Sequence, residues 1–240
     1  MSGPWLAIDT ATEVASVAVG SADRVRAVRS MRGARQHAAQ IVPLIDQVLT
    51  LAAVRVRNLG AIIVADGPGS FTGLRIGWAA AKGLAHDAGI PLRTIPSLMG
   101  VAHAAAHGQA GPVAACFDAL RGQVFGAVYV FPPGRVETLV APGLFTVAAL
   151  AAVAPVRPRV AVGDGAVLYA DDVAHWTGRP PLSLEALSPV ASSLLVLGGR
   201  EGATRALDDP ATAEPEYGRP AEAQAKWEAH HGRPLPHSSR

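Results

Sequence analysis

The sequence predicts an α/β fold in which mixed sheets are flanked by helices. Three strand-like segments are followed by a helix, a strand, a second helix and a further strand. Half of the 240 residues are apolar, which is enough to build a substantial core. A loop with three glycines in the seven residues 67–73 joins a buried strand to a helix.

The chain begins with three short strands and one helix. Apolar or alternating segments predict strands at 5–10, 14–20 and 25–30, and polar alternation in the third places it nearer to an edge. Residues 36–54 are predicted as an amphipathic helix, because apolar side chains recur there every three or four residues. These side chains are Ile41, Leu44, Ile45, Val48, Leu49 and Ala52.

The glycine loop lies between an apolar strand at 61–65 and an alanine-rich helix over 74–88. A strand at 91–95 follows, and Ser97 is expected to cap a helix that ends near His107.

The pattern then starts again, less regularly. Strands are predicted at 113–118, 123–131 and 159–162, with a glycine turn at 163–166 and a helix at 190–198.

Three segments follow from this organisation, with a boundary near residues 109–112. Residues 1–110 form an N-terminal lobe that contains the glycine loop and both long helices, and residues 111–207 form a smaller α/β lobe. Residues 208–240 are rich in proline and charge, so we expect an extended tail over the surface with a disordered end.

Composition excludes several classes of protein. The net charge of +2 does not indicate a strongly basic surface for nucleic acids. The single cysteine, Cys116, cannot form an internal disulfide and suits a reducing cytoplasm. No apolar run is long enough for a membrane span, and the first five residues lack the pattern of a signal peptide. We therefore expect a cytoplasmic protein.

The glycine loop does not match the common nucleotide-binding templates. Leu and Arg follow Gly73, where a P-loop needs Lys and Ser or Thr. Thr72 stands where the dinucleotide fingerprint has its third glycine. A nucleophile elbow around Ser70 would need glycines at the positions of Pro68 and Thr72.

The run GPGSFTGLRIG, residues 67–77, closely resembles the signature of the bacterial TsaB (YeaZ) family. Further landmarks of that family follow in order, and the resemblance covers residues 4 to 220. They lie at 8–12, 36–37, 117–122, 163–165 and 215–219. The resemblance implies a two-lobed actin-like (ribonuclease-H-like, ASKHA) fold with a smaller second lobe.

The resemblance also implies a function. Members of this family work with the catalytic subunit TsaD and the ATPase TsaE to install the threonylcarbamoyl group of N6-threonylcarbamoyladenosine in tRNA. The chain would then be a non-catalytic subunit that binds and activates TsaD and forms a homodimer when alone. TsaE and tRNA would act only through the complex, and no catalytic residue, metal or cofactor is expected.

The interface with TsaD or a second copy is predicted on the two long helices, where small residues permit close approach. The predicted residues are Ile41, Leu44, Ile45, Val48, Arg75, Gly77, Ala80, Ala81 and Leu84. We expect Ala80→Glu or Ile45→Asp to break the pairing without unfolding the chain. Arg75 has three possible partners, namely Asp66, an anion or a carboxylate of the partner.

Two other functions remain open. The first is a stand-alone actin-like ATPase or metallopeptidase that uses Asp9, Asp118 and the loop residues Gly67, Gly69, Ser70, Thr72 and Gly73. No lysine lies nearby, so a degenerate site is favoured, with weak nucleotide binding left open. The second is an independent binding module for tRNA or another protein, against which the low net charge counts.

The histidines are predicted to be structural. His103 and His107 have the i, i+4 spacing of a metal pair, but no acidic residue lies close by, and we expect solvated side chains at a helix end. Catalytic relatives carry such a pair earlier, where this sequence has Ser97 and Val101. His37 is expected to make a local hydrogen bond at a helix start.

Overall fold

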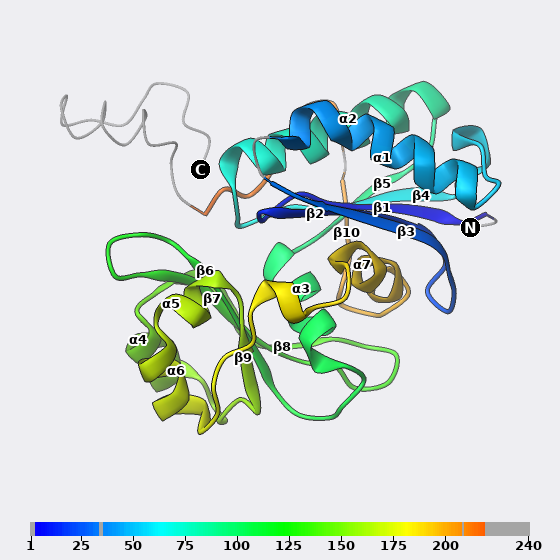
Figure 1. Ribbon diagram of the computed structural model, residues 1–240. Coiled ribbons are helices and arrows are strands. Elements are labelled where there is room, and N and C mark those ends of the chain that lie inside the picture. Colours follow the sequence, from blue (N-terminus) through cyan, green and yellow to red (C-terminus); the bar gives the residue numbers. More distant parts are fainter. Residues whose placement is uncertain (1–2, 34–35, 208, 219–240) are drawn as a thin grey trace.

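The computed structural model describes residues 3–33, 36–207 and 209–218. It has two lobes, each built on one sheet, and Figure 1 shows the larger lobe above the smaller one. In the part of the chain that is described, no helix has both the length and the apolar composition needed to cross a bilayer.

The larger lobe contains a six-stranded sheet in the order β10-β5-β4-β1-β2-β3. Strand β1 pairs with β2 antiparallel and with β4 parallel, so the sheet is mixed as predicted. The strands are β1 (Trp5–Asp9), β2 (Val14–Gly20), β3 (Val25–Arg32), β4 (Ala61–Ala65), β5 (Leu92–Ile95) and β10 (Arg205–Ala206).

The helices of the larger lobe cover both faces of this sheet. Leu6 and Ile8 of β1 point to one face, where they share a core with the two long helices. Ala7 points to the opposite face and joins the core that lies between the two sheets. The helices are α1 (His37–Leu51) and α2 (Phe71–Ala88) on the outer face, the short helix η2 (Val56–Asn58), and α3 (Ser97–Ala106) and α7 (Val190–Gly198) on the inner face.

The four-stranded sheet of the smaller lobe has the same order as four of the six strands of the larger sheet, β3-β2-β1-β4. This sheet has the order β8-β7-β6-β9, from β6 (Val113–Asp118), β7 (Val124–Val130), β8 (Glu137–Phe145) and β9 (Val160–Val162). One face packs on α3, and the other is covered by short helices, as Figure 1 shows. These are α4 (Val147–Val153), α5 (Asp164–Leu168) and α6 (Ala170–Thr177), with η3 (Leu184–Ala186) after them.

The structure divides the chain differently from the sequence prediction in one respect. Residues 111–207 were predicted as one lobe, but α7 packs against β1 and β2, and β10 pairs with β5. The end of that segment therefore belongs to the larger lobe. Strand β8 was not predicted at all. The extended tail is described for residues 209–218, whereas its predicted disordered end lies outside the described residues.

Helix α2 begins three residues earlier than predicted because its start is capped by a side chain. The Ser70 Oγ accepts a hydrogen bond from the Gly73 amide at 3.2 Å, which satisfies one amide of the first turn. Ser97 does not cap its own helix as predicted. Its hydroxyl accepts a hydrogen bond from the Gly67 amide at 2.9 Å instead.

Candidate functional site

The glycine loop packs directly on the turn between β1 and β2. The Thr10 hydroxyl donates to the Gly73 carbonyl at 2.7 Å, and the Ser70 amide donates to the Ala11 carbonyl at 2.7 Å. A side chain at position 69 would place its Cβ 2.5 Å from the Ala11 oxygen, and one at Gly73 would collide with the Thr10 oxygen. Glycine is therefore required here for close backbone approach.

The C-terminal tail covers the other side of the loop. The Glu216 amide donates to the Asp66 carbonyl at 2.6 Å. Gly67 has a φ of +113°, and a Cβ there would collide with the Glu216 carbonyl. The protein's own backbone thus lies against both sides of the loop.

Arg75 contacts the C-terminal tail through Tyr217. Its Nε donates to the Tyr217 hydroxyl at 3.0 Å, and its guanidinium carbon lies 4.2 Å from the centre of the Phe71 ring. The rings of Phe71 and Tyr217 are 4.5 Å apart. Asp66, one predicted partner of Arg75, is instead paired with Arg205 at 3.5 Å.

The carboxylates of the predicted degenerate site have separate environments. Asp9 is 1% exposed, and burial raises its pKa to about 7. Its Oδ1 accepts from the Ala11 amide at 3.2 Å, and its Oδ2 has no partner among the described residues. Asp118 binds its own turn, because Oδ1 accepts from the Leu120 amide at 2.9 Å. Within the described ranges, no three His, Cys, Asp or Glu side chains are grouped so that they could hold a metal ion.

The His103 side chain is largely buried, so the prediction of two solvated histidines is wrong for this residue. Its ring packs edge-on against Phe131 with centroids 5.1 Å apart, and burial together with Arg200 lowers its pKa to about 4. His107 is exposed at the end of α3, where φ is +47°. The two rings therefore do not form a pair on one helix face.

Of the remaining side chains, Cys116 is the buried apolar residue that was predicted, whereas the hydrogen-bond partner of His37 is 24 residues away and not local. His37 is buried at the start of α1, where its Nε2 lies 3.3 Å from the Glu13 carbonyl oxygen. Cys116 is a fully buried apolar residue, and burial raises the pKa of its thiol to about 12. Val101 is packed in the core between the sheets.

Six of the nine predicted interface residues lie inside the protein's own core. The apolar stripe of α1 and the buried side of α2 face the sheet, so these residues are unavailable to a partner, and Ile45→Asp would disrupt the core. The six buried residues are Ile41, Leu44, Ile45, Val48, Gly77 and Ala81. The other three are accessible, with Arg75 exposed and Ala80 and Leu84 half-buried.

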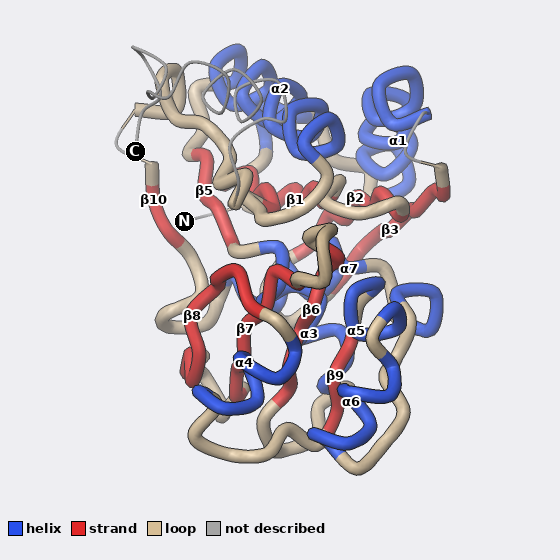
Figure 2. The backbone as a smooth tube through the Cα atoms, turned by 90° about the vertical axis from the view of Figure 1, so that its left-hand side faces the viewer, coloured by secondary structure: helices blue, strands red, loops and turns tan. Residues whose placement is uncertain are grey.

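The surface that faces away from the sheet carries a different set of apolar residues. Helices α1 and α2 lie side by side there, as Figure 2 shows. Ala79 and Gly83 of α2 are exposed, and a Cβ on Gly83 would meet nothing within 4 Å. Val42 of α1 is 64% exposed. We call this surface the outer helical face and define it by Val42, Ile76, Ala79, Ala80, Gly83 and Leu84.

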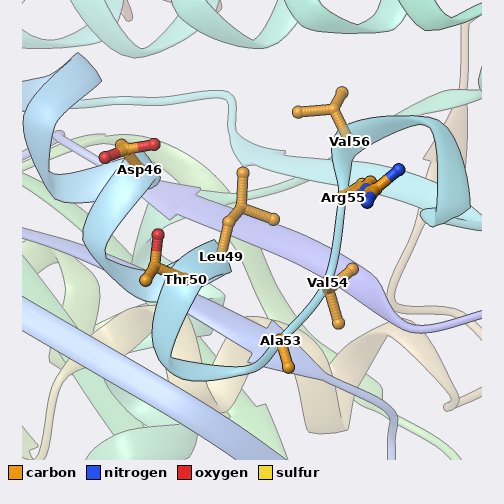
Figure 3. Close-up of a pocket in the computed structure, with 7 residues that line it drawn as sticks. All are labelled: Asp46, Leu49, Thr50, Ala53, Val54, Arg55 and Val56. Atoms are coloured by element: carbon orange, nitrogen blue, oxygen red, sulfur yellow. The ribbon is translucent and has the colours of Figure 1, made fainter.

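A hollow lies at the end of α1, one turn beyond Val42. Figure 3 shows its charged residues Asp46 and Arg55 on opposite sides, with Leu49 between them. It is lined by Asp46, Leu49, Thr50, Ala53, Val54, Arg55 and Val56. The outer helical face thus continues into a depression that presents both apolar and charged groups.

The sequence contained a weak signal for this face. Val42 interrupts the polar side of the α1 pattern, and Ile76, Ala79 and Gly83 share the three- and four-residue spacing of one helix face. The contact of the tail with Arg75 had no local signal, because it joins residues 142 positions apart.

Two sheets that share a four-strand order, packed on either side of α3 and α7, define an actin-like protein of the ribonuclease-H-like class. Within this class, residues 29–164 match the family model described as "TsaD: tRNA N6-adenosine threonylcarbamoyltransferase". The chain is 31% identical over 226 residues to the tRNA threonylcarbamoyladenosine biosynthesis protein TsaB of Bacillus subtilis (strain 168), which covers 92% of this chain and 96% of that protein. The chain belongs to the TsaB (YeaZ) family.

Two further comparisons agree with this assignment. The TsaB protein of Escherichia coli (strain K12) is 39% identical over 125 residues, or 52% of this chain and 54% of that protein. The solved structure of YeaZ from Pseudomonas aeruginosa is 27% identical and has a TM-score of 0.70, with 90% of this chain and 99% of that chain covered. The predicted family and the predicted two-lobed actin-like fold are both confirmed.

Proposed function

We propose that this chain is a non-catalytic subunit that binds TsaD and activates it for threonylcarbamoyl transfer to a tRNA adenosine, in the cytoplasm. Its relatives carry the name of tRNA threonylcarbamoyladenosine biosynthesis proteins, which supports this pathway. The observation that carries the proposed mode of action is the outer helical face, a surface of apolar and small residues on two neighbouring helices of the larger lobe.

The physical chemistry of this face suits helix packing. Ala79 and Gly83 leave the backbone of α2 accessible, so a helix of the partner can approach closely. Val42 and Ile76 supply apolar area whose burial favours association. The same face serves the homodimer, so a second copy and TsaD compete for it.

The closed glycine loop supports a subunit without catalytic residues, metal or cofactor. Thr10 and Ala11 lie against one side of the loop and Glu216 against the other, where an actin-like ATPase would hold phosphates. Ser97 and Val101 are not metal ligands. TsaE and tRNA would then act through the complex with TsaD.

One observation favours the alternative of an actin-like ATPase. The Oδ2 of Asp9 is buried and has no partner among the described residues, and the neighbouring Thr10 and Ala11 contact the glycine loop. Calorimetric titration of the chain with ATP and Mg²⁺ distinguishes the two functions. Binding that Asp9→Ala abolishes would favour the ATPase, and a lack of heat would favour the partner subunit.

The decisive experiment is light scattering on a sizing column, with the chain mixed with TsaD of the same genome. We expect a stable complex for the wild type and none for Ala79→Glu, because a carboxylate would be buried in the interface. Ala152→Glu is the matched control, an exposed alanine on α4 of the smaller lobe, and it should associate normally. Normal association of Ala79→Glu would refute the outer helical face as the interface.

A further inference from the structure

Positive charge is concentrated on one strand of the larger lobe. Residues 24–32 contain four arginines and no acidic residue, whereas the net charge of the whole chain is only +2. The arginines are Arg24, Arg26, Arg29 and Arg32, and all four are exposed. We call them the arginine edge.

The arginine edge follows the last strand of the six-stranded sheet. Strand β3 pairs with β2 along its inner side, and no other described strand pairs with its outer side. Figure 1 shows this strand at the front of the sheet, and Figure 2 shows it at the margin. The arginines therefore stand on a free margin of the molecule.

The strand presents arginines on both of its faces. Ala27 and Met31 pack on the core under α1, so Arg29, which has the same parity, leaves the sheet on that face. Val28 packs on the core between the sheets, so Arg32, which has the same parity, leaves on the other face. Arg26 is exposed at the register shift of the β2–β3 pair, where the alternation is interrupted. A linear ligand along the margin is thus within reach of arginines from either side.

Little of this charge is neutralised within the protein. Arg32 forms an ion pair with Glu185 of the smaller lobe. Arg24, Arg26 and Arg29 form no ion pair with any residue that the structure describes. The guanidinium of Arg29 donates only to the neighbouring Val28 carbonyl at 3.0 Å.

We propose that the arginine edge binds the phosphodiester backbone of an RNA, which on the function proposed above is the tRNA acted on by the complex. A strand rises about 3.3 Å per residue, so Arg26 and Arg32 are roughly 20 Å apart, a distance that spans several phosphates of one nucleic-acid strand. The planar guanidinium can bind a phosphate through two parallel hydrogen bonds. Such contacts position the RNA and do not read its sequence.

The proposal agrees with the low net charge of the chain. Three unpaired arginines give weak RNA binding to the chain alone, because affinity for nucleic acids grows with the number of neutralised phosphates. In the complex, the same contacts add to those of the other subunits. The arginine edge therefore contributes most when the complex is assembled.

The test uses the double variant Arg26→Gln/Arg29→Gln, which leaves the pair of Arg32 and Glu185 intact. The control is Arg121→Gln/Arg179→Gln, two exposed arginines of the smaller lobe. Each full-length variant is first mixed with TsaD, and complex formation is measured by light scattering. Binding of fluorescently labelled tRNA to the complex is then measured by anisotropy between about 50 and 200 mM salt.

We expect the double variant to assemble normally and to bind tRNA roughly tenfold more weakly at the lowest salt. The slope of log K against log salt should fall by about one to two, since two phosphate contacts are lost. Arg26→Lys/Arg29→Lys should keep the slope of the wild type, and the control variant should keep both quantities.

Unchanged affinity and slope in a normally assembled double variant would overturn the proposal and leave the proposed function intact. The arginines would then only protect a free strand edge against aggregation. If the wild type fails to bind TsaD, the proposed function fails instead. Binding of tRNA is then measured on the isolated chain. Equal tRNA binding by the wild type and the double variant would overturn the proposal for the arginine edge.

Discussion

The sheets of the two lobes share a four-strand order, but their outer helices are very different. In the larger lobe, α1 and α2 have 15 and 18 residues. In the smaller lobe, α4, α5 and α6 have 7, 5 and 8 residues. Short helices cover their sheet and leave little surface, whereas the long helices bury one side on the sheet and leave the other side accessible. On the function proposed above, the outer layer of helices, and not the sheet, distinguishes the lobe that binds a partner from the lobe that does not.

The largest effect should come from a charge on the buried side of α1. Ile45 is 4% exposed, so Ile45→Asp places a carboxylate in the core and should lower the free energy of unfolding by about 5 kcal/mol or prevent folding. Urea unfolding followed by circular dichroism measures this change. Ala79→Glu, on the exposed side of the same layer, should leave stability within ~0.5 kcal/mol of the wild type.

Leu150→Asp makes the matched change under the short helices of the smaller lobe, where Leu150 is fully buried. It should destabilise the protein to a similar extent. A stable Ile45→Asp variant that still binds TsaD would contradict the prediction. It would show that the apolar stripe of α1 is not part of the core, so that α1 and α2 have no buried side distinct from an exposed one.

A smaller effect is expected from Asp9, at the end of β1. Its pKa is raised from 3.8 to about 7, so the folded state binds the proton more tightly than the unfolded state. The contribution of Asp9 to the free energy of unfolding is therefore fully present below pH 3.8 and is lost as the pH rises towards 7. Asp9→Asn should remove this loss, which amounts to a few kcal/mol because one pKa unit corresponds to ~1.4 kcal/mol.

The measurement is the urea midpoint of wild type and Asp9→Asn between pH 4 and 8. Asp118 occupies the corresponding position at the end of β6, so Asp118→Asn is the matched change in the other lobe. The loss of stability that Asp9 causes as the pH rises should persist in this variant, since Asp9 is intact. Parallel curves for wild type and Asp9→Asn would contradict the burial of a charged group there.

The smallest effect concerns the glycine turns. Gly73→Ala should destabilise by roughly 2 kcal/mol, because its Cβ would collide with the Thr10 carbonyl. The smaller lobe has a similar turn, in which a Cβ on Gly165 would lie 2.6 Å from the Phe117 carbonyl carbon, so Gly165→Ala should behave alike. Differential scanning calorimetry gives both values.

Gly83→Ala is the control, because the space around Gly83 is open and alanine favours a helix by about 1 kcal/mol. This variant should be more stable than the wild type. A stabilised Gly73→Ala variant would mean that the loop does not pack on the turn after β1.

Local patterns predicted most elements of this fold. Strands such as Val113–Asp118 and helices such as Val190–Gly198 have the predicted bounds, because their periodicity is uninterrupted. Strand β8 was missed because Pro142 and Gly143 interrupt its pattern. The loop signature identified the family, but the spacing of small and apolar residues did not show which of them are buried in the protein's own core.

The reason lies in what periodicity measures. A stripe such as Ile41, Leu44 and Val48 states that one side of a helix is buried, and not whether a sheet or a partner covers it. His103 was misplaced for a related reason, since its neighbour Phe131 comes from another part of the chain. Contacts between distant segments are a property of the tertiary fold and leave no local pattern.

The return of the chain to the larger lobe has a consequence for its architecture. The smaller lobe is inserted between α3 and α7, so two separate crossings tether it to the larger one. A fragment that ended at residue 110 would lack α7, and Ala7, Ala18 and Ile63 on the inner face of its sheet would lose the helix that covers them. The lobes are thus nested and not consecutive, and neither can be gained, lost or exchanged by cutting the chain once.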